Sequence, residues 1–202
     1  AAETLELDSK DKKALNQIKD EVTIIDQLVQ DLLHLSHFDR PSVSHKIERF
    51  PLSDLVNECI KRTVIVAKKK NLSLKINPES QKDIHINAIK LLIERALDNV
   101  INNAIRYSPQ NGQITISFEK NSKYCLLKIH DEGEGVNDKD LEKIFEPFFR
   151  LDSSRNRQTG GFGLGLSLVK RILDLHKGSV AAFNHLDGFM IEMKIPLHED
   201  MS

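Results

Sequence analysis

The chain has 202 residues, of which 40% are hydrophobic and 29% are charged, and its formal net charge is −1. This length suits one large domain, or one domain with an appendage. The near-zero charge excludes a broad electrostatic attraction to nucleic acid or to anionic membranes. Cys59 and Cys125 both lie in apolar patterns, so we interpret them as core residues in a reducing compartment. The histidines show no metal-ligand spacing, and no apolar run is long enough to span a bilayer.

A long amphipathic helix is predicted over residues 12–38. Its apolar residues recur at spacings of three and four, which is the pattern of a heptad seam: Leu15, Ile18, Val22, Ile25, Val29 and Leu32. Further apolar residues widen this seam toward a four-helix bundle. A single helix packed on its own domain is the alternative, but the unbroken seam favours a bundle between chains. We therefore assign residues 1–40 to a partial helical dimerisation region, followed by a Pro- and Ser-containing linker over residues 41–51.

The remaining residues, 52–202, predict one domain that contains both helices and strands. A helix starts at Leu52, with apolar residues up to Ala67, and alternation predicts strands around residues 72–76 and 84–86. The longest helix of this part is expected over residues 87–107. Strands follow at 112–118 and 124–130, then a short helix over 138–145, a helix to about His176, and a final hairpin. Because helices and strands are segregated, we predict an α/β two-layer sandwich with a mostly antiparallel sheet.

A polar stripe lies on the long helix predicted over residues 87–107. Asn99 and Asn103 are four residues apart and Arg106 follows three residues later, so all three side chains share one face. An amide oxygen is a suitable Mg²⁺ ligand, and arginine offers a fixed positive charge to phosphates. Asparagine is a poor helix former, so its repeated use here favours a functional stripe over a merely exposed helix face.

A second candidate site follows the strand over residues 124–130. Asp131 precedes Gly133 and Gly135, and a carboxylate at this place can accept a hydrogen bond from the exocyclic amine of adenine. Glycines allow the backbone to approach a flat base closely. An ordinary turn is the alternative, because Asp-x-Gly is common in turns.

A glycine-rich turn, Gly160 to Gly165, leads into the last long helix. The unpaired N–H groups of a helix N-terminus, together with its positive potential, form a natural phosphate site. A tight connection without any ligand is the alternative interpretation.

Taken in order, these segments resemble the N, G1, F and G2 boxes of sensor histidine kinases, which belong to the ATPase superfamily of gyrase, Hsp90 and MutL. In this order, the four matching segments are the Asn/Arg helix, Asp-x-Gly-x-Gly, Phe-Glu-Pro-Phe-Phe and Gly-x-Gly-x-Gly. The resemblance covers residues 50–197. The sequence around the last box looks similar to kinases paired with OmpR-type regulators, including CpxA-like sensors. The resemblance implies the GHKL, or Bergerat, ATP-binding fold, preceded by a helix of a dimerisation bundle.

The resemblance also implies a role for each matching residue. Asn103 is expected to hold Mg²⁺, with Asn99 and Arg106 beside the metal and the phosphates. Asp131 is expected to bind the adenine amine. The remaining nucleotide contacts and lid positions are expected at Tyr107, Gly133, Gly135, Arg150, Arg155, Gly161, Gly163, Leu164 and Gly165.

The sequence departs from the family at two points. Phe162 stands where these kinases usually carry Thr or Ser, and no histidine is followed by the phosphoacceptor sequence. The resemblance implies that the chain is the cytoplasmic ATP-binding part of a bacterial inner-membrane sensor kinase, with ATP and Mg²⁺ as cofactors. Because the acceptor sequence is missing, we expect that this chain does not phosphorylate itself. Its implied partners are a response regulator and a second copy through the bundle; no nucleic acid is expected, and the membrane is reached only through N-terminal segments. A non-catalytic, nucleotide-gated interaction module is the alternative.

Overall fold

The computed structural model describes residues 46–80, 84–151 and 162–197. The chain divides into two compact units, Ala1–Arg40 and Pro41–Ser202. The predicted heptad helix lies outside the described residues, and so do residues 41–45 of the predicted linker. All that follows concerns the second unit.

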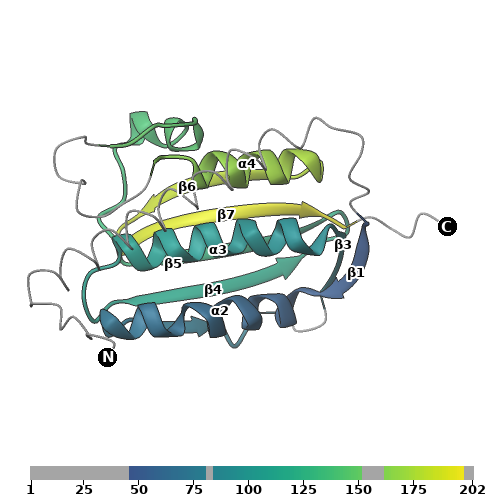
Figure 1. Cartoon of the computed structure of the whole chain (residues 1–202), viewed down its shortest axis with the longest axis horizontal. Helices are drawn as coiled ribbons and strands as arrows, with labels where there is room; N and C mark the ends of the chain where they lie inside the picture. Colours follow the sequence, from purple (N-terminus) through teal and green to yellow (C-terminus); the bar gives the residue numbers. More distant parts are fainter. Residues whose placement is uncertain (1–45, 81–83, 152–161, 198–202) are drawn as a thin grey trace, which may run out of the picture. The chain divides into compact units, whose positions relative to one another are not determined.

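A five-stranded sheet forms one layer of this unit, in the order β2-β4-β5-β7-β6 (Figure 1). Its strands are β2 (Ser73–Ile76), β4 (Gln113–Lys120), β5 (Tyr124–Asp131), β6 (Ser179–His185) and β7 (Gly188–Pro196). β2 runs parallel to β4, and every other neighbouring pair is antiparallel. The prediction of a mostly antiparallel sheet is confirmed.

Three helices form the second layer, and Figure 1 shows them side by side across one face of the sheet. They are α2 (Leu52–Lys69), α3 (Lys90–Tyr107) and α4 (Gly165–Leu175). On the central strands β4 and β5, alternate residues are buried beneath these helices; in β4 they are Ile114, Ile116 and Phe118. This alternation, combined with the helical spacing of buried residues in α3, produces the predicted α/β two-layer sandwich.

One predicted core position of α2 is wrong. The apolar pattern of residues 52–67 includes Val64 and so predicts that it is buried. It is 37% exposed, and Thr63 is buried instead at 5% exposure. Thr63 lies four residues after Cys59 and four before Ala67, so it shares their face of the helix. Its hydroxyl donates to the carbonyl of Cys59 at 3.0 Å, and this bond satisfies the only polar group of the side chain. Cys59 and Cys125 are both fully buried, as predicted.

Two further differences lie at the entrance to α3. Residues Glu48–Pro51, assigned to the linker, form strand β1, which pairs antiparallel with β3 (His85–Ala88) in a separate two-stranded sheet. Asn87 and Ala88 therefore belong to a strand, and α3 begins at Lys90, three residues later than predicted. The short helix expected over residues 138–145 is two 3₁₀ turns, η1 (Asp138–Asp140) and η2 (Lys143–Phe145).

The face of the sheet away from the helices carries polar pairs. Lys128 bonds Glu119 at 2.7 Å and lies 3.7 Å from Glu192 on the strand at its other side. The Lys194 ammonium lies 4.0 Å from the centre of the Tyr124 ring. Such pairs suit a sheet face in contact with water. Among the described residues, no helix combines the length and apolarity that crossing a bilayer requires.

Candidate functional site

The C-terminal half of α3 carries four of the predicted site residues. Asn99 and Asn103 are half-buried, whereas Arg106 and Tyr107 are exposed, Tyr107 to 56%. The amide nitrogen of Asn99 donates to the carbonyl of Arg95 at 2.9 Å, so its oxygen points away from this bond. Within the described part of the chain, no hydrogen bond engages the side-chain amide of Asn103. A half-buried amide with no internal partner is available to a ligand.

The first residue of α4 approaches Asn99 closely. A Cβ placed on Gly165 would lie 2.8 Å from Oδ1 of Asn99. The N-terminus of α4 therefore faces the middle of α3, and any side chain at position 165 would collide with the Asn99 amide. This contact brings the predicted phosphate turn onto the polar stripe of α3.

Asp131 ends β5 and is almost entirely buried, at 5% exposure. Its Oδ1 accepts the N–H of Gly133 at 2.8 Å, and no described residue donates to Oδ2. Burial raises the pKa of the Asp131 carboxyl to about 6, although the Gly133 N–H and the nearby His130 lower it in part. A buried carboxyl with one unused oxygen is an environment suited to recognising a hydrogen-bond donor.

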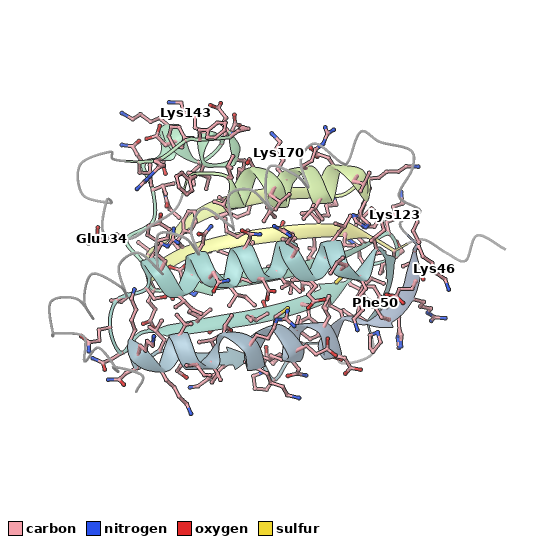
Figure 2. All side chains as sticks on the ribbon, viewed as in Figure 1. Lys46, Phe50, Lys123, Glu134, Lys143 and Lys170 are labelled. Carbon is pink, nitrogen blue, oxygen red and sulfur yellow. The ribbon has the colours of Figure 1, made fainter. Side chains whose placement is uncertain are left out.

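The loop after Asp131 lies against the end of α3. A Cβ on Gly133 would lie 3.0 Å from the backbone oxygen of Tyr107. Figure 2 labels Glu134 of this loop at one end of the molecule and Lys123 and Phe50 at the other end. Because Asn99 and Tyr107 are eight residues apart, the Gly165 and Gly133 contacts lie about 12 Å apart along the helix axis. An extended nucleoside triphosphate spans a comparable length.

Gly163 of the phosphate turn has a backbone conformation in the left-handed region. Gly163 has φ 72°, and its carbonyl accepts the N–H of Phe148 at 3.0 Å. A Cβ there would lie 2.5 Å from the Phe149 oxygen, so only glycine fits between these backbones. Phe148 itself has φ 65° and is 63% exposed, and Phe162 is 43% exposed. Leu164 is buried and its carbonyl accepts the hydroxyl of Ser167 at 2.9 Å.

Of the three phenylalanines in the Phe-Glu-Pro-Phe-Phe segment, only Phe145 is buried, at 7% exposure. Arg150 is exposed at the end of the described segment before residue 152, and Arg155 and Gly161 lie outside the described residues. Within residues 46–80, 84–151 and 162–197, no group of three or more His, Cys, Asp or Glu side chains is arranged to hold a metal ion. A metal bound here would thus rely on an amide oxygen and on phosphate oxygens.

Two residues that support the site were missed in the sequence. Lys70 ends the basic run Lys68-Lys69-Lys70, a pattern that in the sequence alone is typical of a solvated helix end. Its ammonium instead donates to the carbonyls of Ile105 at 3.0 Å and Arg106 at 2.6 Å. It thereby stabilises the end of α3 that carries Arg106 and Tyr107. Asn184 of β6 forms two hydrogen bonds with Val136, in the loop that contains Gly135. Neither residue belongs to a spacing pattern that would identify it.

Comparison with known proteins identifies the family of the chain. Residues 88–199 match the family model of histidine kinase-, DNA gyrase B-, and HSP90-like ATPases. The chain belongs to this ATPase family. Its curated relatives include the sensor histidine kinase WalK of Bacillus subtilis, 33% identical over 86% of this chain, and CpxA of Escherichia coli, 31% identical over 95%. CpxA is thus one of several relatives of this ATP-binding histidine kinase domain. The chain spans 29% and 41% of the lengths of these two proteins.

Solved structures of the histidine kinase ThkA resemble the domain as well. Its catalytic domain is 27% identical, with a TM-score of 0.67 over 75% of this chain and 95% of that one. A complex of ThkA with the response regulator TrrA is 25% identical, with a TM-score of 0.73 over 98% of this chain and 53% of the ThkA chain. The fold is therefore that of a histidine kinase catalytic domain, and ATP is the nucleotide that this family binds.

Proposed function

We propose that this domain binds ATP with Mg²⁺ along the C-terminal half of α3 and transfers the γ-phosphoryl group to a histidine of a dimerisation helix. The observation that carries the proposal is the pair of contacts that flanks this helix segment. Asn99 meets Gly165 at one end, and Tyr107 meets Gly133 at the other. The phosphate turn and the Asp131 loop, far apart in sequence, thus adjoin one polar stripe.

In this proposal, Asp131 binds the adenine. Its unused oxygen accepts a hydrogen bond from the exocyclic amine, while Gly133 and Gly135 shape the loop beside the base. Guanine presents an oxygen where adenine presents the amine, so it would leave a buried carboxylate without a donor. Tyr107 borders the nucleotide at the end of α3, where its side chain is 56% exposed.

The triphosphate extends toward α4. Asn103 holds Mg²⁺ through its unpartnered amide oxygen, with Asn99 beside the metal and Arg106 contacting phosphate. When bound, Mg²⁺ supplies neutralisation of phosphate charge. The N-terminus of α4 offers backbone N–H groups to the phosphates at Gly163, Leu164 and Gly165. By resemblance to the family, Arg150 and Arg155 are assigned to the terminal phosphate, and Gly161 to the lid hinge and the phosphates.

The catalytic effect expected from this arrangement is mainly positioning and charge stabilisation. A histidine nitrogen of the acceptor helix attacks the γ-phosphorus, the bond to the bridging oxygen of ADP breaks, and ADP leaves in line. The phosphoryl group then passes to an aspartate of a response regulator. Because no histidine in the sequence is followed by an acceptor box, we expect this chain to transfer phosphate only to an acceptor supplied in trans.

The organisation of the whole protein is part of the same proposal. Residues 1–40 form part of a dimerisation bundle, 41–51 a linker and 52–202 the catalytic domain. Two copies associate through the bundle, and the domain works on the cytoplasmic side of a bacterial inner membrane, where ATP is available. A response regulator, of OmpR type, is the proposed partner; the ThkA–TrrA complex supports an interaction of this class.

The first test is calorimetric titration of ATP into the wild type, Asp131→Asn and Asn103→Ala, with and without Mg²⁺. Both variants should bind about tenfold more weakly or worse, and Asn103→Ala should also lose the dependence on Mg²⁺. Asn102→Ala is the matched control, because Asn102 is its exposed neighbour on α3. Equal affinity in all four proteins would contradict the assigned site.

The second test separates a kinase from a nucleotide-gated module. A histidine-bearing acceptor-helix fragment of a related sensor kinase is mixed with the domain and γ-labelled ATP. Acid-labile label on the fragment supports the kinase. Tight ATP binding without any transfer would favour the non-catalytic alternative, in which exposed Phe162 alters the phosphate turn.

A further inference from the structure

The side-chain amide of Asn184, near the end of β6, binds the loop that follows Asp131. Its Oδ1 accepts the N–H of Val136 at 3.1 Å, and its Nδ2 donates to the carbonyl of Val136 at 2.7 Å. The same nitrogen donates to Oδ1 of Asp138 at 2.7 Å. The amide therefore pairs with both backbone groups of one residue, as a neighbouring strand would, across 48 positions of sequence.

Among the described residues, the backbone of Val136 makes no other hydrogen bond. The loop from Glu132 to Asn137 contains no helix or strand, and its first half is held by the bond from Gly133 to Asp131. Asn184 thus provides the corresponding attachment for the second half. The Glu132 side chain also anchors the first half, since it accepts the N–H of Gln113 at 3.0 Å. Without Asn184, no hydrogen bond among the described residues would tie Val136 to the rest of the domain.

Gly135 makes room for this attachment. It has φ 71°, and a Cβ on it would collide with Oδ1 of Asn184. The absence of a side chain at position 135 is therefore required by the asparagine, in addition to any close approach of a nucleotide. The close approach of Asn184 to Gly135 is a contact that the sequence pattern alone does not indicate.

The hairpin of β6 and β7 reaches the other end of the loop as well. Gly188 has φ 154°, and a Cβ there would overlap the backbone oxygen of Asp131. Asp131 and Val136 are thus both held against the same hairpin, one by close backbone packing and one by the amide of Asn184. The distance between the adenine-binding carboxylate and the loop beside it is set by this support.

We propose that Asn184 is a positioning residue for base recognition: it fixes Val136, and thereby the Gly133–Gly135 backbone, relative to the Asp131 carboxylate. It acts through the loop and does not touch the nucleotide. This inference rests on the proposed function, since it assumes that the loop borders adenine. It adds a residue of β6 to a site otherwise built from α3, β5 and the start of α4.

The test measures discrimination between bases rather than affinity alone. Dissociation constants are measured for ATP and for inosine triphosphate, which carries an oxygen in place of the 6-amino group. Asn184→Ala should reduce the preference for ATP about tenfold, since it removes three hydrogen bonds that order the loop. Hydrogen exchange at the Val136 amide should accelerate in the same variant.

Asn121→Ala is the matched control. The Asn121 side chain also binds backbone N–H groups, those of Lys123 at 2.9 Å and Tyr124 at 2.8 Å, in the turn between β4 and β5. That turn lies at the opposite end of the molecule from Glu134, where Figure 2 labels Lys123. Its loss should lower thermal stability and leave the ratio of the two dissociation constants unchanged.

A second pair of variants keeps the inference testable if Asn184→Ala does not fold. Asn184→Asp places a second carboxylate beside that of Asp138. Adding Asp138→Asn restores a hydrogen bond between the two side chains, now donated by the amide at position 138 to the carboxylate at position 184. The double variant should recover base preference relative to Asn184→Asp alone. Loss of stability with an unchanged ratio in every Asn184 variant would show a merely structural role and overturn the inference. Wild type that does not prefer ATP would overturn the proposed function itself, and the inference with it.

Discussion

The Oδ1 atom of Asn99 lies 2.8 Å from the point where a side chain on Gly165 would begin. Gly165 is the first residue of α4, and its φ is not positive, so the backbone itself accepts alanine. The glycine is therefore needed for the space that Asn99 occupies and not for helix geometry. A substitution at position 165 can therefore displace the Asn99 amide without straining the helix backbone.

We predict that Gly165→Ala impairs ATP binding without a matching loss of stability. Alanine favours a helix by up to about 1 kcal/mol relative to glycine, which offsets the bond between Asn99 and Arg95 that the displaced amide would lose. ATP affinity should nevertheless fall about tenfold, because the amide leaves the phosphate end of the site. Thermal unfolding and calorimetry on the same samples measure the two effects.

A double variant checks the assigned cause. If Gly165→Ala acts by displacing Asn99, then combining it with Asn99→Ala should bind ATP no more weakly than Asn99→Ala alone. Additive losses of affinity would mean that the added methyl group at position 165 obstructs the phosphates directly.

The stability of the domain should fall as the pH rises from about 4 to about 6. The pKa of Asp131 is raised to about 6 from an ordinary 3.8 by burial, so the folded state holds this proton where the unfolded state has lost it. The stabilisation is fully present below the pKa of the unfolded state and is lost as the pH rises through the pKa of the folded state. The total decrease in the free energy of unfolding is on the order of 3 kcal/mol. Denaturant unfolding of wild type and Asp131→Asn across this range measures the effect. The difference between their free energies of unfolding should change with pH, because the variant lacks the titrating carboxyl.

ATP affinity should change with pH in the opposite direction. A carboxylate accepts a hydrogen bond from the adenine amine more strongly than a neutral carboxyl does, by about tenfold in affinity. Binding should therefore weaken as the pH is lowered through about 6, and Asp131→Asn should show no such transition. An identical pH profile in the variant would exclude Asp131 as the titrating group.

His176 connects the end of α4 to the start of α3. Its Nε2 accepts the N–H of Ile89 at 3.0 Å, and its Nδ1 lies 2.7 Å from the carbonyl of Ile172. Because the ring is 8% exposed, His176→Ala should leave a cavity and an unpaired N–H and destabilise the domain by about 3 kcal/mol. His85→Ala, at an exposed position of β3, is the control and should change the free energy of unfolding little.

Lys70→Met should affect both stability and the site. It removes the ammonium that binds the carbonyls of Ile105, Arg106 and Ser108, and we expect a loss of about 1 kcal/mol. Since these carbonyls end α3, ATP affinity should fall as well. Lys69→Met removes an exposed lysine of the same run and should leave both quantities unchanged; equal effects of the two variants would contradict the assignment.

The sequence predicts the order of elements well, because each strand and helix carries its own periodicity. Ile114, Ile116 and Phe118 alternate in β4, and the buried residues of α3 recur at helical spacing. The errors at the ends of β1 and α3 occur where a partner distant in sequence decides the structure. Residues 48–51 become a strand only by pairing with β3, and that pairing also delays the start of α3 to Lys90.

The candidate site divides in the same way. Asn103, Asp131 and Gly165 lie in compact motifs, so they could be named from the sequence through their resemblance to a family. Lys70 and Asn184 could not, because each acts through a contact with residues at least 35 positions away. An isolated lysine in a basic run, or an asparagine at a strand end, has no local pattern that reveals such a contact.

The backbone packing at Gly188 has a practical consequence for labelling. Two positions before it, Leu186 is fully exposed at the hairpin tip, and the Asp187 side chain is 80% exposed. A fluorescent dye attached to a cysteine at 186 would therefore lie outside the fold, yet on the same hairpin whose Gly188 packs against the Asp131 backbone. Such a dye offers an optical signal for nucleotide arrival, whereas the glycine two residues later admits no tag.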